Sequence, residues 1–173
     1  RTRFLLHLVD IAPYDETDPV HAVNVIAHEL ERFSPTLASL PRWLILNKTD
    51  LVPSAEEVDA RCDDIVARLG WTGPVFRTSG LTKDGAMAVC YRLMEAIEEQ
   101  RAAEAADPAL AEAEQAKREQ LVQEGRERIR ELDVRRSAER RAQRMGIDPS
   151  QLDDDDDDWD EDAEDAPEII YRP

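Results

Sequence analysis

Within residues 1–100, a short apolar run followed by the start of an amphipathic helix occurs three times, and this alternation limits the possible folds more than any other feature. The apolar runs span residues 4–10, 43–46 and 75–78. Such runs are typical of strands that are buried on both faces of a parallel sheet. Strands that alternate with helices predict right-handed crossover connections. We therefore predict an α/β fold, a parallel sheet with flanking helices.

The helices between these runs are predicted from their end signals and their apolar spacing. Asp18-Pro19 supplies an N-cap and a proline at the first helical position. Ser54 and Glu57 have the spacing of a capping box, and Gly70 is a typical C-terminal stop. The stripes comprise Val23, Ile26, Leu30 and Phe33 in the first helix, Val58, Cys62, Ile65 and Leu69 in the second, and Ala86, Cys90, Leu93 and Ile97 in the third. We expect these stripes to face the sheet, with both cysteines buried as reduced thiols.

The segment Asn47-Lys48-Thr49-Asp50 directly follows the second apolar run. A carboxylate such as that of Asp50 can accept two hydrogen bonds from guanine, one from N1–H and one from the exocyclic amino group. Adenine lacks this pair of donors, so a carboxylate facing it would be left without partners. The alternative is structural, because Thr49 and Asp50 are also suited to a turn before the helix that starts at Ser54.

This segment resembles the base-recognition motif of GTP-binding proteins. The resemblance implies that the Asn47 amide ties the loop to the rest of the site and contacts the base, while the Lys48 stem lies over the purine face and Thr49 occupies the variable position. It also assigns a role to Ser79-Gly80-Leu81 after the third run, where GTPases carry a Ser-Ala-type loop. The loop's backbone N–H groups would reach guanine O6, and the serine hydroxyl would brace the Asp50 carboxylate. Gly80 replaces the common alanine, and a plain turn is the alternative.

The segments 3–10, 18–19, 41–50 and 69–71 are together similar to the second half of the nucleotide domain of the Obg (CgtA) family of bacterial GTPases. The resemblance covers residues 1 to about 97 and, loosely, the acidic C-terminal end. It implies the second half of a P-loop GTPase-like parallel sheet that binds GTP or GDP, with Mg²⁺ as cofactor. It further implies a cytoplasmic monomer whose partner is the large ribosomal subunit, its RNA and its proteins, with roles in subunit assembly and in stress-linked growth control.

The chain departs from the family pattern in what it lacks. It has six glycines and neither a Gly-x-x-x-x-Gly-Lys-Ser/Thr phosphate loop nor an Asp-x-x-Gly sequence. Phosphate and metal contacts supply essentially all of the catalysis in such enzymes. We therefore expect a C-terminal fragment of a longer GTPase, with no catalytic or metal-binding residues of its own, that does not hydrolyse GTP alone.

Three regions are predicted. The resemblance implies that residues 1–100 are the guanine-recognition half of the GTPase domain. Charge and composition predict a long charged helical extension over 101–147 and a disordered tail over 148–173. The last region holds 13 acidic residues against one basic residue, which prevents a packed structure. Arginines between residues 135 and 144 either contact ribosomal RNA phosphates or complement the helix dipole and the nearby aspartates. The sequence contains no apolar span long enough for a membrane. A second function class is a non-enzymatic interaction module that uses this helix and the tail.

Overall fold

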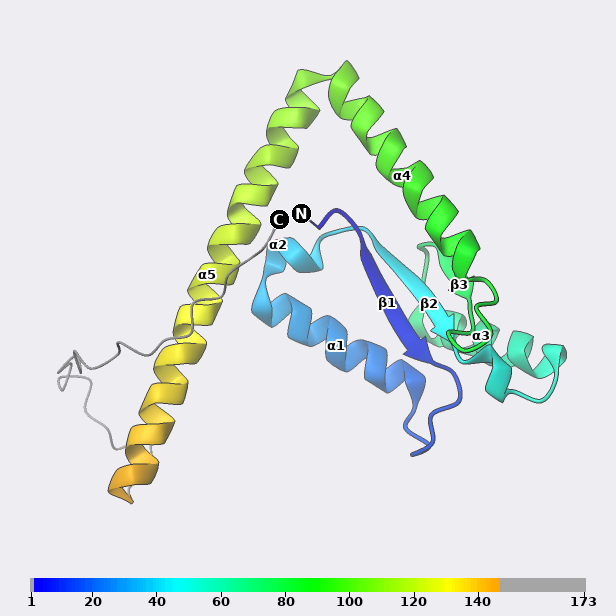
Figure 1. Ribbon diagram of the computed structural model, residues 1–173, viewed down its shortest axis with the longest axis horizontal. Helices are drawn as coiled ribbons and strands as arrows, with labels where there is room; N and C mark the ends of the chain where they lie inside the picture. The colour runs from blue at the N-terminus through cyan, green and yellow to red at the C-terminus, as the bar shows by residue number, and fades with distance from the viewer. Residues whose placement is uncertain (1, 147–173) are drawn as a thin grey trace. The chain divides into compact units, whose positions relative to one another are not determined.

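The computed structural model describes residues 2–146, which form a three-stranded parallel sheet with flanking helices (Figure 1). The elements are β1 (Leu5–Asp10), α1 (Pro19–Phe33), α2 (Pro35–Ala38), β2 (Arg42–Asn47), the 3-10 helix η1 (Thr49–Leu51), α3 (Ala55–Leu69), β3 (Val75–Arg77), α4 (Ala86–Ala106) and α5 (Pro108–Met145). The strand order is β1-β2-β3, and both strand pairs are parallel. The predicted α/β fold with a parallel sheet is confirmed.

The central strand β2 supplies the core of both faces of the sheet. Leu44 and Leu46 are fully buried in a cluster with side chains from α1 and α3. Trp43 and Ile45 point to the opposite face and pack with Val89 and other side chains of α4. Burying a side chain of this size stabilises a fold by about 1.5–3 kcal/mol. The continuous apolar run therefore becomes a strand covered by helices on both sides.

Strand β1 does not have the burial that its sequence predicted. Leu6 and Leu8 are 38% and 63% exposed, whereas Val9 is buried. The exposed pair lies on the face that carries Trp43 and Ile45, since Leu6 pairs with Trp43 and Leu8 with Ile45. Because α4 packs over β2 and β3, it leaves β1 uncovered on that face. The prediction that this run is buried on both faces is wrong for the described residues.

Two of the predicted helix stripes need correction. In α1, Val20 and Val23 are buried, but Ile26 and Phe33 are exposed. In α4, the buried positions are Val89 and Ala96, and Cys90 is exposed. Cys90 follows Val89 by one residue, which turns its side chain about 100° away from the sheet-facing stripe. The predicted burial of Cys90 is wrong, whereas Cys62 is buried as expected, and both thiols are free.

The helix ends follow the local signals in the sequence. The Asp18 carboxylate accepts a hydrogen bond from the Val20 N–H, and the Ser54 hydroxyl accepts one from the Glu57 N–H. Gly70 ends α3 in the left-handed region, with a φ of 57°. These bonds satisfy backbone groups that a helix end leaves without partners. They also fix where the connecting loops begin, and thereby the positions of the strand ends.

Helix α5 is anchored by a contact that the sequence did not reveal. The Glu124 carboxylate accepts hydrogen bonds from the hydroxyls of Ser34 and Thr36 and from the Thr36 N–H, the last at 3.1 Å. Ser34 is fully buried and caps the short helix α2. These bonds lower the pKa of Glu124 to about 2, with the Ser34 hydroxyl as the largest cause. The predicted long charged helix is confirmed over Pro108–Met145, whereas residues 101–106 belong to α4. Around Glu124 the helix is held by these hydrogen bonds.

Acid is expected to remove the contribution of Glu124 to stability. A carboxylate whose folded pKa is depressed stabilises the fold fully above its unfolded pKa, here 4.5, and loses this contribution as the pH falls toward 2. At pH 7 we expect Glu124→Gln to lower the free energy of unfolding by about 1–2 kcal/mol. The difference should vanish near pH 2, which urea unfolding at a series of pH values measures. A deficit of equal size at both ends of the series would contradict this role.

The described residues divide into two compact units, 2–129 and 130–146. Region boundaries at residues 100 and 147 stay a prediction. The predicted disordered tail, residues 148–173, lies outside the described residues. Among residues 2–146, no helix has both the length and the apolar character needed to cross a bilayer.

Candidate functional site

The two predicted recognition segments lie at the same edge of the sheet. Leu46 at the end of β2 pairs with Arg77 at the end of β3, and the Thr78 N–H donates to the Leu46 carbonyl at 2.8 Å. Because the strands are parallel, the residues that follow each strand emerge side by side. Segments 47–50 and 79–81 are therefore neighbours although about 30 residues separate them in sequence.

The Asn47 amide joins these segments. Its Oδ1 accepts hydrogen bonds from the Gly80 N–H at 2.9 Å and from the Thr78 hydroxyl at 3.2 Å. Thr49 adds a second link, since both its N–H and its hydroxyl donate to the Thr78 carbonyl. Thr78 is buried. Its sequence context predicts only the last residue of a strand and no role in the site. Its position just before Ser79-Gly80 is the signal that could have identified it.

Lys48 occupies a left-handed backbone conformation, with φ 69° and ψ 35°. Its ammonium pairs with the Asp10 carboxylate, with 2.6 Å between Nζ and Oδ2. Asp10 ends β1 directly beside Asn47 in the sheet register. Sequence reasoning did not assign Asp10 to the site, although its place at the carboxyl end of a parallel strand is where ligands of such sheets bind.

The Asp50 carboxylate has no partner among the described residues. It lies in the exposed first turn of η1, and within residues 2–146 its side chain makes no hydrogen bond or ion pair. The surface aspartates of α3 differ: Asp59 and Asp63 both pair with Arg77, and Asp64 pairs with Arg68. An unpaired acceptor next to a fixed loop is available to a ligand with two adjacent donors.

In the loop after β3, the polar groups of Ser79 and Gly80 form hydrogen bonds within the chain. Ser79 is 1% exposed, its N–H donates to the Asp84 carbonyl, and its hydroxyl accepts from the Thr82 N–H at 3.0 Å. No bond from Ser79 to Asp50 forms among the described residues, and the Gly80 N–H already serves Asn47. The Leu81 N–H has no acceptor in this part of the chain, and its side chain is 82% exposed. Within segment 79–81, Leu81 is therefore the residue whose N–H remains available to a ligand.

The described residues do not offer a metal site. Residues 2–146 contain no cluster of three or more histidine, cysteine, aspartate or glutamate side chains that could hold an ion. Mg²⁺ prefers several oxygen ligands in near-octahedral geometry. The resemblance implied Mg²⁺ contacts from residues outside this chain, and no role for the ion is derived from residues 2–146.

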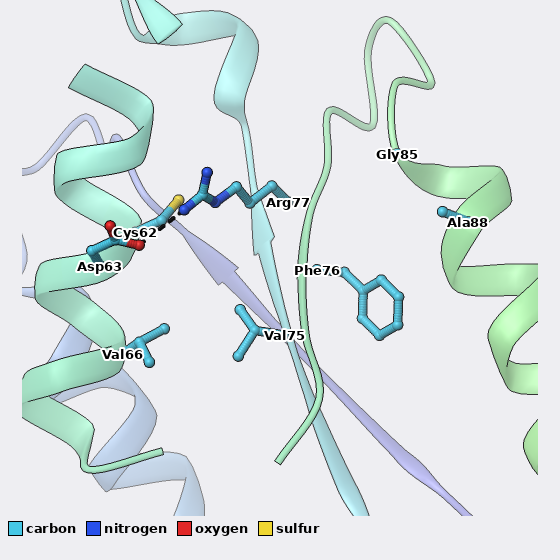
Figure 2. Close-up of a pocket in the computed structure, with 8 residues that line it drawn as sticks. All are labelled: Cys62, Asp63, Val66, Val75, Phe76, Arg77, Gly85 and Ala88. Atoms are coloured by element: carbon cyan, nitrogen blue, oxygen red, sulfur yellow. Dashed lines mark hydrogen bonds and ion pairs between the residues drawn. The ribbon is translucent and has the colours of Figure 1, made fainter. Parts of the chain in front are cut away.

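A cavity of about 540 Å³ lies away from these segments, between α3, β3 and α4 (Figure 2). Arg77 points from β3 toward Cys62 and Asp63, whereas Phe76 points to the opposite side, toward α4. Binding pockets usually present polar groups that are free to orient a ligand. Here the Arg77 guanidinium forms ion pairs with Asp59 and Asp63. Burial raises the pKa of the Cys62 thiol. This hollow therefore lacks the groups of a recognition site.

Comparison with known proteins bears on the family of this chain. No family model matches the chain. Over 126 residues, or 73% of its length, the chain is 54% identical to the GTPase Obg of Psychrobacter sp. (strain PRwf-1). The chain belongs to the Obg family. This confirms the resemblance that the sequence indicated, and the matched residues of this Obg-family chain span 31% of that relative's length.

Proposed function

We propose that the strand-end site is the guanine-recognition part of an Obg-type GTPase. The base-binding residues are Asn47, Lys48, Thr49, Asp50, Ser79, Gly80 and Leu81. The observation that carries the proposal is the Asp50 carboxylate, which has no partner among residues 2–146 and lies beside a loop that the Asn47 amide joins to the segment after β3. Asp50 accepts from guanine N1–H and the amino group, and the Leu81 N–H donates to O6.

The activity of the whole protein is part of the same proposal. It hydrolyses GTP to GDP with Mg²⁺, and the phosphate and metal contacts come from residues outside this chain. It acts in the cytoplasm as a monomer, and its partner is the large ribosomal subunit, whose RNA and proteins it contacts during assembly. The support is the identity to a protein named GTPase Obg, together with the family resemblance of the segments described above.

Nucleotide selectivity tests the proposal. The product of the complete gene is expected to bind GDP at least a hundredfold more tightly than ADP, because adenine would leave the Asp50 carboxylate facing no donor. Isothermal titration calorimetry with both nucleotides measures the ratio. Equal affinities would refute guanine recognition and favour the non-enzymatic interaction module. The 173 residues alone should show no GTP hydrolysis above the buffer rate.

A further inference from the structure

The two carboxylate oxygens of Asp10 contact different partners. Its Oδ1 accepts the Ala12 N–H at 2.9 Å, which fixes the side chain to the backbone just after β1. Its Oδ2 lies 2.6 Å from Lys48 Nζ. The carboxylate is about one-third exposed, and the local bond orients it before any ligand arrives. Asp10 is thus a preorganised acceptor for the Lys48 ammonium.

Lys48 needs such a partner because its backbone neighbours do not fix its side chain. Asn47 and Thr49 are held by bonds to Thr78 and Gly80, which set the backbone of the loop. The Lys48 stem retains four rotatable bonds and the rotamer freedom that goes with them. Among residues 2–146, Asp10 is the acidic group that its ammonium contacts. The ion pair therefore selects one direction for the stem.

The same pair keeps the Asp50 carboxylate free. Lys48 lies two residues before Asp50, close enough in sequence for its flexible cation to compete for that carboxylate. Asp50 nevertheless makes no ion pair in the described part of the chain, whereas Lys48 is engaged with Asp10. Asp10 thus affects both the direction of the Lys48 side chain and the availability of the Asp50 carboxylate.

We propose that Asp10 is a positioning residue for guanine binding. It holds the Lys48 ammonium so that the methylene stem lies across the purine face and Asp50 stays open to the guanine edge. This inference rests on the proposed function of the site. Asp10 itself touches no nucleotide and acts through Lys48.

The test is a double-mutant cycle on GDP affinity in the complete gene product. Asp10→Asn keeps an oxygen for the Ala12 N–H but removes the charge that holds Lys48. We expect the Kd for GDP to rise about fivefold, the factor that corresponds to an ion pair of the exposed class. In a Lys48→Met background, which keeps an unbranched stem without charge, Asp10→Asn should leave the Kd unchanged.

A matched control tests whether the effect on GDP affinity is specific to Asp10, and the possible outcomes distinguish the positioning role from the proposed function. Asp64→Asn breaks an ion pair with Arg68 on α3 and should not alter the Kd. Thermal unfolding should show that Asp10→Asn retains the fold. If the unaltered protein binds GDP and Asp10→Asn binds it equally well, or if its effect persists beside Lys48→Met, the positioning role is overturned while the proposed function stands. If the unaltered protein does not bind GDP, both fall.

Discussion

Asp50→Asn is expected to weaken GDP binding by about a hundredfold or more and to raise the affinity for xanthosine diphosphate. The carboxylate accepts two charge-assisted hydrogen bonds from guanine, each contributing about 1.5–3 kcal/mol. An asparagine amide retains one acceptor but presents donors where guanine also has donors. Xanthine carries an oxygen in place of the exocyclic amino group, so the amide donors of Asn face an acceptor there. The substitution therefore changes which base is preferred as well as how tightly it binds.

Calorimetric titration of the complete gene product with guanosine, xanthosine and adenosine diphosphates measures this change. Glu56→Gln is the matched control, because it neutralises an exposed carboxylate in the first turn of α3, just downstream of the site. It should leave all three affinities within about twofold of the unaltered values. If Asp50→Asn behaves like Glu56→Gln, then Asp50 is a turn residue and does not read the base.

The parts of the fold that were predictable are those with local causes. Asp18, Ser54 and Gly70 set helix ends through hydrogen bonds and a backbone angle that involve residues within a few positions of each other. The run at β2 is apolar on both faces, so its central place in a parallel sheet follows from its own composition. Such features can be predicted because the interactions that cause them involve residues close together in the sequence.

The predictions that were wrong or incomplete concern residues whose burial or contacts depend on an element far away in sequence. Leu8 looks like a core residue, but its exposure depends on how far α4 extends over the sheet. Cys90 belongs to a helical apolar stripe, yet the packing of Val89 and Ala96 sets a different face toward β2. Glu124 reads as one charge among many on a polar helix, and only its distance to Ser34 shows that it is an anchor.

The candidate site divides in the same way. Segment 47–50 carries its own chemical signature, which is why it was found from sequence. Thr78 and Asp10 were missed because their contacts cross from one strand to another, and neither forms a motif with its sequence neighbours. Parallel register brings these residues together, so strand ends should be read jointly once a parallel sheet is predicted.

Gly85→Ala is expected to cost about 3 kcal/mol or more of stability, and to lower the Tm by roughly 6–12 °C. Gly85 caps α4 with a φ of 68°, and a Cβ there would lie 2.1 Å from the Arg77 carbonyl oxygen. The Arg77 oxygen belongs to the backbone and the position of a Cβ is fixed by its own backbone, so no side-chain rotation relieves the overlap. The residue after Arg77 is Thr78, which holds Asn47 and Thr49, so GDP affinity should fall together with stability.

Two other glycines separate the causes of this effect. Gly70 has a similar φ of 57°, but a Cβ there would meet no atom within 4 Å, so Gly70→Ala should cost only the left-handed backbone strain, about 1–2 kcal/mol. Gly125 lies within α5, also with nothing within 4 Å, and Gly125→Ala should stabilise the chain by about 0.5–1 kcal/mol. Differential scanning calorimetry of the three variants should therefore rank Gly125→Ala above the unaltered chain, then Gly70→Ala, then Gly85→Ala. A Gly85→Ala variant as stable as Gly70→Ala would mean that β3 and α4 can separate freely, and that the segment after β3 is not held in place by this close contact.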